Sequence, residues 1–147
     1  MEKNTKIVLL VGGVFVGFAA LIIGVAGLIF WGVWQATAEP VAAVRAQLEA
    51  INQDDYERAH SYFSTRLREL RSAEDFRAYV EENKAALKTT DSTFSNRSIE
   101  NNVATLRGTL TGRDGRTTPV RYVLVKENSR WVIDSFRFGP DAAEEEK

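Results

Sequence analysis

An uncharged run at residues 7–34 constrains this chain of 147 residues more than any other feature. The hydrocarbon core of a bilayer is about 30 Å thick, and about 20 apolar residues in an α-helix cross it. The run contains 28 residues, so it can span a membrane even as a tilted helix. The polar segment that follows has the length of one compact domain. We therefore expect a transmembrane helix at residues 7–34 and a single folded domain after it.

Basic residues near the ends of the run predict its orientation. Lys3 and Lys6 precede it, and the next basic residue after it is Arg45. Lysine and arginine accumulate on the cytoplasmic side of a membrane span. We expect a single-pass protein with a cytoplasmic N-terminus at residues 1–6 and an extracytoplasmic domain, on the periplasmic or extracellular side.

A cleaved signal peptide is the alternative for the same segment. Ala36, Thr37 and Ala38 form a small-x-small sequence of the kind that signal peptidases cut. The apolar regions of signal peptides contain about 7–15 residues, and this run is nearly twice as long. Trp31 and Trp34 also lie where an interfacial aromatic belt is expected. These features favour an uncleaved anchor in the lipid bilayer.

Small residues follow one face of the predicted membrane helix. Steps of four and three residues align five of them: Gly13, Gly17, Ala20, Gly24 and Gly27. Membrane helices associate through such faces because small side chains let two backbones approach closely. We expect this face to pack against another transmembrane helix, from a second copy or from a different subunit. The alternative is that glycine is simply frequent in membrane helices.

The domain begins after a short join at residues 35–39, and Pro40 suits the first turn of a helix. Asp54 and Ser72, each followed three residues later by an acidic residue, are typical of capped helix starts. Apolar residues at steps of three and four predict three helices. Their expected ranges are 40–52, 54–70 with a break near Ser64, and 72–88.

Alternating side chains predict four β-strands in the second half of the domain. Their expected ranges are 93–99, 103–110, 117–126 and 130–138. Short turns rich in Asn, Asp and Gly separate these segments, so consecutive strands are expected to pair as an antiparallel meander. Residues 139–147 contain four acidic side chains and are expected to form a flexible, solvated tail.

Three helices followed by an antiparallel sheet predict an α+β domain whose helices cover one face of the sheet. Two passages carry a family resemblance: AINQDDYERAHSYFS at residues 50–64 and RWVIDSF at residues 130–136. They resemble the nuclear-transport-factor-2-like group of cystatin-like or SnoaL-like cones, and within it the small bacterial membrane-anchored members. The resemblance covers residues 40–138 and implies a cone-shaped domain with a curved sheet. Such domains include isomerases, dehydratases, ligand binders and assembly subunits, so the fold alone selects no function.

Enzymes of this fold place the active site between sheet and helices, where catalysis needs ionisable groups that point inward. His60 is the only histidine, and it lies beside the apolar stripe of the second predicted helix. Asp134 alternates with Val132 and Phe136 and shares their predicted sheet face. A cluster of Tyr56, His60 and Asp134 is the resulting catalytic hypothesis. We favour the alternative, in which these side chains are solvated or locally paired, because spacing does not establish convergence.

A small apolar ligand is the expected occupant if the cone encloses a cavity. Aromatic residues of the predicted helices and strands are candidates for its wall: Phe63, Phe76, Tyr79, Tyr122 and Trp131. Most of these residues are better explained as ordinary core, because aromatic side chains bury large apolar areas.

No cofactor or metal site is predicted. Asp54 and Asp55 are adjacent carboxylates, but helix capping explains them and no nearby histidine or cysteine completes a site. The chain has no cysteine, which excludes disulfides and lipidation on cysteine. From Glu39 onward, 17 basic and 19 acidic residues give a net charge of −2, which argues against nucleic-acid binding.

These features predict a non-enzymatic, membrane-anchored accessory or assembly subunit of a membrane protein complex. The helix would pack through its glycine and alanine face, and the short join would hold the domain near the same assembly. The second hypothesis is an extracytoplasmic domain that binds a small molecule as a sensor or carrier. An isomerase- or dehydratase-like enzyme is the third.

Overall fold

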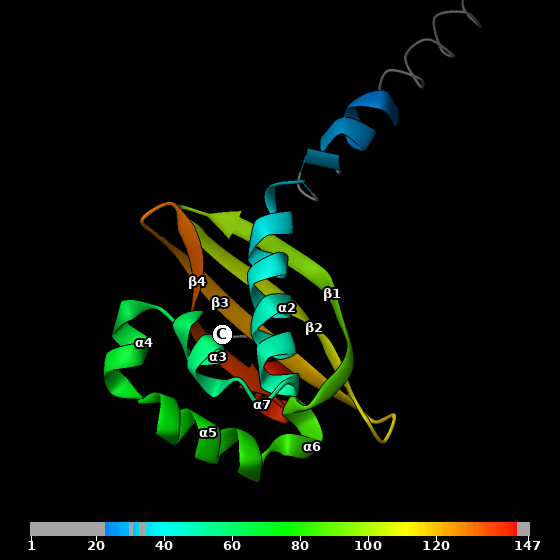
Figure 1. The fold of residues 1–147 in the computed structure, drawn as a ribbon. Coiled ribbons are helices and arrows are strands. Elements are labelled where there is room, and N and C mark those ends of the chain that lie inside the picture. The colour runs from blue at the N-terminus through cyan, green and yellow to red at the C-terminus, as the bar shows by residue number, and fades with distance from the viewer. Residues whose placement is uncertain (1–22, 30, 33–34, 144–147) are drawn as a thin grey trace, which may run out of the picture. The chain divides into compact units, whose positions relative to one another are not determined.

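The computed structural model describes residues 23–29, 31–32 and 35–143 (Figure 1). The chain divides into two compact units, of which the second begins at Ala36. Residues 23–29 and 31–32 of the first unit are helical and exposed. Within the described part of the chain, no helix has the length and apolarity required to cross a membrane.

Only part of the predicted membrane segment can be compared with the structure. Gly24 and Gly27 are in the described helix, and a Cβ atom added at either would meet nothing within 4 Å. Trp31 is exposed, at 63% of its full accessibility. The remaining predicted packing and anchoring residues lie outside the described residues: Gly13, Gly17, Ala20 and Trp34. The span and its packing face therefore stay predictions.

Among the described residues, five helices form the first half of the domain, and the three predicted helical regions account for them. They are α2 (Ala38–Asn52), α3 (Tyr56–Ser61), α4 (Thr65–Leu70), α5 (Ala73–Glu82) and α6 (Lys84–Leu87). The break expected near Ser64 is confirmed, because Ser64 is the N-cap of α4. The third predicted helix is interrupted at Asn83. Helix α2 begins inside the predicted join, with Pro40 in its first turn as expected.

The helix starts follow the predicted capping chemistry with one correction. Ser72 Oγ accepts a hydrogen bond from Asp75 N at 3.1 Å, and Ser72 N donates to Asp75 Oδ2 at 3.4 Å, which completes a capping box. The N-cap of α3 is Asp55 and not Asp54, because Asp55 Oδ1 accepts from Arg58 N at 3.2 Å. Asp54 has a φ of 57° and belongs to the turn before the helix.

Four strands follow in one antiparallel sheet, arranged in sequence order. They are β1 (Thr89–Glu100), β2 (Val103–Gly112), β3 (Thr117–Glu127) and β4 (Arg130–Phe138). The predicted meander is confirmed, although β1 begins before the expected start at Thr93. The β1–β2 and β3–β4 turns need residues at positive φ, as tight hairpins of this hand do. These residues are Asn101, Asn102, Asn128 and Ser129.

Helices α2–α6 lie on one face of the sheet, and the core fills the space between the two layers (Figure 1). Every second side chain along the central strands is buried in this core: Ala104, Leu106 and Leu110 from β2, and Val120, Tyr122 and Leu124 from β3. The predicted α+β architecture is therefore confirmed for the domain. We call the helix-covered face of the sheet the inner face, and the opposite one the outer face.

The start of the predicted acidic tail, residues 139–147, is ordered as a short helix, α7 (Pro140–Ala143). Gly139 has a φ of 84° and donates its N–H to Pro119 O at 2.9 Å, which turns the chain after β4. Ala142 is 4% exposed, because α7 packs against β3 and β4. Burial of this small apolar side chain distinguishes the segment from a solvated tail.

The register of β1 and β2 depends on a close backbone approach at Gly108. Gly108 pairs with Phe94 beside an irregularity in β1, and a Cβ atom added to it would lie 1.7 Å from Thr93 O. We expect Gly108→Ala to lower the free energy of unfolding by about 1–3 kcal/mol, because the β1 backbone must move. Urea denaturation of the full chain in detergent, followed by circular dichroism, measures the loss. The neighbouring exposed position supplies the control, Thr109→Ala, and equal losses would contradict the prediction.

Candidate functional site

The outer edge of strand β4 contains a β-bulge at Asp134. Val123 of β3 pairs with Ser135, whereas the next residue, Leu124, pairs with Ile133. Asp134 is therefore the extra residue on β4. Bulges of this kind change the direction of side chains and occur often beside functional sites.

The bulge corrects the strand phase predicted around Asp134. Simple alternation places Asp134 on the same face as Val132 and Phe136. Ile133 belongs to the core and Phe136 packs against it, so the residues on the two sides of the bulge have opposite phase. The side chain of Asp134 lies at the edge of the sheet with 26% of its surface exposed.

Residues 62–64 pair with this edge of the sheet. Ile133 N donates a hydrogen bond to Tyr62 O at 2.8 Å, and Ser64 N donates to Ile133 O at 2.8 Å. The two bonds form a short parallel bridge centred on Phe63 and Ile133. The segment between α3 and α4 thereby covers the backbone of β4 at the point where the bulge occurs.

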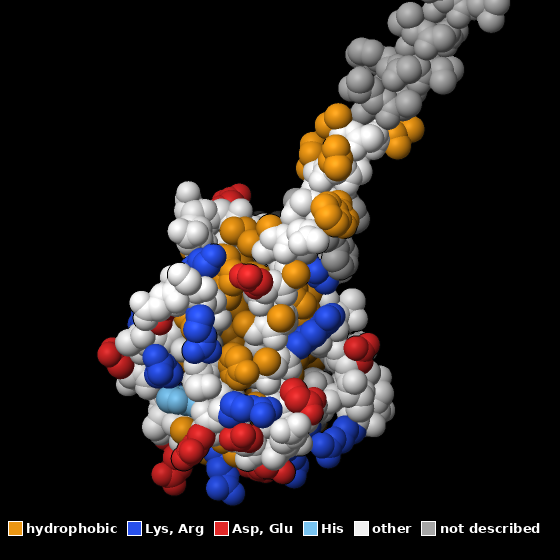
Figure 2. All heavy atoms as spheres, turned by 45° about the horizontal axis from the view of Figure 1, so that its top comes forward, with side chains coloured by type: hydrophobic (Ala, Val, Ile, Leu, Met, Phe, Trp, Pro, Cys, Tyr) orange, Lys and Arg blue, Asp and Glu red, His pale blue; other side chains and the backbone are white. Residues whose placement is uncertain are grey.

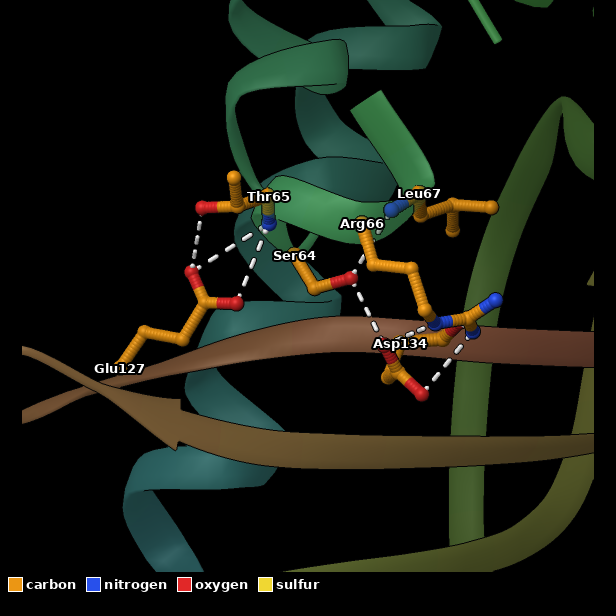
Figure 3. A network of polar contacts seen from close by, with 6 residues as sticks. All are labelled: Ser64, Thr65, Arg66, Leu67, Glu127 and Asp134. Carbon is orange, nitrogen blue, oxygen red and sulfur yellow. Dashed lines mark hydrogen bonds and ion pairs between the residues drawn. The ribbon is translucent and has the colours of Figure 1, made fainter. Parts of the chain in front are cut away.

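Asp134 is the centre of a polar network above this bridge (Figure 3). Ser64 Oγ donates to Asp134 Oδ1 at 2.8 Å. Arg66 donates from Nε to Oδ1 at 3.2 Å, and from Nη2 to Oδ2 at 3.0 Å and to the backbone oxygen at 2.8 Å. The bonds from Arg66, followed by that from Ser64, hold the pKa of Asp134 below its usual value. The carboxylate is therefore ionised at neutral pH, and both of its oxygens accept hydrogen bonds within the network.

A second carboxylate holds the same helix start. Glu127, at the end of β3, accepts from Thr65 N at 3.1 and 3.3 Å and from Thr65 Oγ1 at 2.9 Å (Figure 3). Ser64 Oγ also accepts from Leu67 N at 3.1 Å. These oxygens satisfy N–H groups that have no partner within the helix. The first turn of α4 is thus attached to β3 and β4.

A hollow of about 250 Å³ opens beside this network. Its lining includes Phe63, Arg66, Leu67, Arg71, Tyr79 and Phe136. The guanidinium carbon of Arg71 lies 4.8 Å from the centroid of the Tyr79 ring, a cation–π contact. Burial raises the pKa of Tyr79, so its phenol stays neutral. The hollow is smaller than common ligand pockets, which measure about 300–1,000 Å³.

Aromatic side chains fill the interior of the cone. The ring centroids of Phe63 and Phe76 are 4.8 Å apart at an interplanar angle of 82°. Phe63 is 0%, Phe76 1% and Tyr122 1% exposed. Of the five predicted wall residues, Phe63 and Tyr79 line the small hollow. The other three belong to the core: Phe76, Tyr122 and Trp131.

The three predicted catalytic residues take part in separate polar networks. His60 Nε2 lies 2.6 Å from Arg71 O, and the His60 ring packs edge-on against Phe63 at 5.9 Å. Asp134 is held by Ser64 and Arg66, and Tyr56 binds carboxylates of its own. General acid–base catalysis requires groups that converge on one reacting atom. Sequence spacing alone suggested that Tyr56, His60 and Asp134 converge. In the structure each of them is hydrogen-bonded to residues outside the predicted cluster.

Tyr56 belongs to a polar cluster that sequence reasoning missed. Tyr56 Oη lies 2.9 Å from Glu81 Oε1 and 3.1 Å from Asp54 Oδ1, and Lys88 pairs with Asp54. Burial, followed by the bonds to Glu81 and Asp54, raises the pKa of Tyr56. Two open depressions of about 530 and 590 Å³ share Asp54 and Glu81 in their linings. The cluster joins the start of α3 to α5 and α6, a contact that no local spacing indicates.

The adjacent carboxylates of Asp54 and Asp55 diverge in the structure. Asp55 caps α3 and pairs with Arg58, whereas Asp54 pairs with Lys88. Within the described ranges, no group of three His, Asp or Glu side chains is placed to hold a metal ion. The capping function predicted for the pair is confirmed for Asp55.

Comparison with known proteins assigns this architecture to a family. A family model described as a domain of unknown function, DUF4864, matches residues 34–145. The chain belongs to the DUF4864 family. None of the curated proteins matches the chain.

Solved structures define the fold of this DUF4864 domain. An NTF-2 like protein of unknown function from Shewanella oneidensis MR-1 is 18% identical with a TM-score of 0.53, and the match covers 71% of this chain and 98% of that one. A protein named Rd1NTF2_05, with five substitutions, is 16% identical with the same TM-score and the same two coverages. The predicted NTF2-like fold is thereby confirmed for the domain.

The ion pair between Asp134 and Arg66 predicts an acid-sensitive contribution to stability. The folded-state pKa of Asp134 lies below 3.8, so the pair stabilises the fold above that pH, and the contribution is lost as the pH falls through the lowered value. We expect Asp134→Asn to lower the free energy of unfolding at pH 7 by about 1–2 kcal/mol. The difference from the natural chain should shrink at acidic pH, because Asp134 is then protonated in both states.

Urea denaturation of the full chain at several pH values measures this difference. Glu100→Gln removes an exposed carboxylate from β1 and is the control. A loss for Asp134→Asn that stays constant from neutral to acidic pH would show that the ion pair is not its source.

Proposed function

We propose that this protein is a non-enzymatic accessory subunit of a membrane protein complex, anchored by one helix and docking through its DUF4864 domain. The observation that carries the proposal is the filled cone. Phe63, Phe76 and Tyr122 are at most 1% exposed and occupy the space between sheet and helices. These buried rings favour a domain that acts through its surface over one that holds a substrate between sheet and helices.

The polar residues near the mouth of the cone support the same conclusion. Asp134 is bonded to Ser64 and Arg66, and the guanidinium of Arg71 lies over the Tyr79 ring. These contacts attach α4 and α5 to the sheet. They stabilise the fold and hold the side chains away from a common reacting atom.

The anchoring part of the proposal rests on the uncharged run at residues 7–34. Its length, the lysines before it and the line of small residues within it favour a packed transmembrane helix with the domain outside the cytoplasm. Because α2 begins at Ala38, few residues remain for a linker. The domain would therefore act close to the bilayer and to the same partner as the helix.

A sensor or carrier of a small apolar molecule is the second candidate function. The hollow beside Arg71 and Tyr79 is the observation that favours it. Its volume of about 250 Å³ lies below the common range for ligand pockets, so we place this function second.

Replacement of small residues on the predicted packing face tests the proposal. We expect Gly17→Leu combined with Gly24→Leu to reduce co-isolation of partner chains at least tenfold, because bulky side chains prevent close helix approach. Extraction in a mild detergent, followed by affinity isolation and mass spectrometry, measures the recovery.

The control places the same residue type on another part of the helix surface. Ile22→Leu with Ile29→Leu should leave recovery of partners unchanged. A natural chain that is strictly monomeric and without partners in the intact membrane would overturn the proposed function.

A further inference from the structure

The hollow beside the Asp134 network is positively charged. Three charged side chains line it: Arg66, Arg71 and Asp134. Arg66 and Asp134 neutralise each other, because they form an ion pair at 3.0 Å (Figure 3). Among the described residues, no hydrogen bond or ion pair engages the guanidinium of Arg71. The charge of the lining therefore resides on Arg71.

The backbone and the side chain of Arg71 are both held in place. Arg71 N donates a hydrogen bond to Leu67 O at 3.0 Å, and His60 Nε2 lies 2.6 Å from Arg71 O. The guanidinium carbon lies 4.8 Å from the centroid of the Tyr79 ring. Such a cation–π contact orients the planar group and leaves its N–H donors free to bind a ligand. A side chain positioned in this way loses little freedom when a ligand binds.

The walls of the hollow next to Arg71 are apolar. They include the half-buried side chains of Leu67, Tyr79 and Phe136. The rings of Tyr79 and Phe136 pack edge to face, with centroids 5.9 Å apart at an interplanar angle of 73°. The volume of about 250 Å³ corresponds to about eight water molecules. The hollow therefore has room for a small apolar group beside one positive charge.

We propose that this hollow binds a small apolar monocarboxylate, with its carboxylate on Arg71 and its apolar part against Leu67, Tyr79 and Phe136. A carboxylate accepts two parallel hydrogen bonds from the planar fork of a guanidinium. The same chemical group occurs in free organic acids and in the C-terminal residue of a partner chain. The inference goes beyond the accessory role proposed above, because it concerns a ligand site within the domain.

Neutral molecules and dianions suit this hollow less well. A neutral apolar ligand would cover the N–H donors of Arg71 without giving them an acceptor, and unsatisfied donors are costly. A dianion such as phosphate would need a second cation, but Arg66 is already paired with Asp134. One free guanidinium beside apolar walls therefore selects a single negative charge on an apolar body.

Fluorine NMR with 4-fluorobenzoate and the full chain in mild detergent tests the inference. We expect saturable broadening of the fluorine resonance, with a Kd of about 0.1–1 mM for a ligand of this size. The matched probe is 4-fluorobenzamide, which has nearly the same shape without the charge and should bind at least tenfold more weakly. Detergent micelles without protein give the background for both probes.

Matched variants remove the same charge from two positions near the end of α4. Arg71→Gln should weaken binding of 4-fluorobenzoate at least tenfold, whereas Arg68→Gln, outside the lining of the hollow, should change it less than twofold. Arg71→Lys should also weaken binding, because lysine keeps the charge but lacks the planar fork. Circular dichroism checks that each variant is folded. The comparison of acid with amide uses the natural chain and depends on no variant.

A pair of peptides distinguishes the two sources of the carboxylate. A tetrapeptide that ends in leucine with a free C-terminus should displace 4-fluorobenzoate if the hollow receives the C-terminal residue of a partner. Its C-terminal amide should not displace the probe. Binding of 4-fluorobenzoate that the free peptide does not displace would assign the hollow to a free organic acid.

Three results would overturn the inference. These are equal binding of 4-fluorobenzoate and 4-fluorobenzamide, equal losses in Arg71→Gln and Arg68→Gln, or no binding of the acid up to about 10 mM. Any of them would leave the proposed accessory role standing, because co-isolation of partners through Gly17 and Gly24 tests that role separately.

Discussion

The bridge between Ile133 and residues 62–64 is the contact on which the rest of the domain depends. An open sheet edge exposes unpaired N–H and C=O groups, and here two backbone bonds of 2.8 Å satisfy those of Ile133. The same bridge directs Phe63 into the core against Phe76 and starts α4 at Ser64. The same three residues, 62–64, therefore cover the edge of β4, contribute Phe63 to the core and start α4.

The bridge at Ile133 also brings the start of α4 close to the bulge of β4. The bulge brings Asp134 to the mouth of the cone, where Ser64 and Arg66 use its carboxylate to secure α4. The helix-covered side of the molecule presents mixed charges with apolar side chains between them (Figure 2).

Much of the fold was predictable because its signals are local. Helical and strand periodicities, the capping box at Ser72 and the asparagines of the tight turns each depend on a few neighbouring residues. The candidate site was less predictable. Sequence spacing grouped Tyr56, His60 and Asp134, but each is bonded elsewhere, because contacts between distant segments choose the partners. One inserted residue at the bulge was enough to make the predicted phase of β4 wrong.

The sequence by itself determined the class of the domain, the order of its elements and the uncharged run before it, since hydrophobic periodicity and turn chemistry are properties of short segments. Only the tertiary structure decided that the cone is filled and that α4 is held by Asp134 and Glu127. It alone aligned Arg107, Arg121 and Arg137 across three neighbouring strands. The physical reason is that strand register and side-chain packing are set by contacts between residues far apart in the chain.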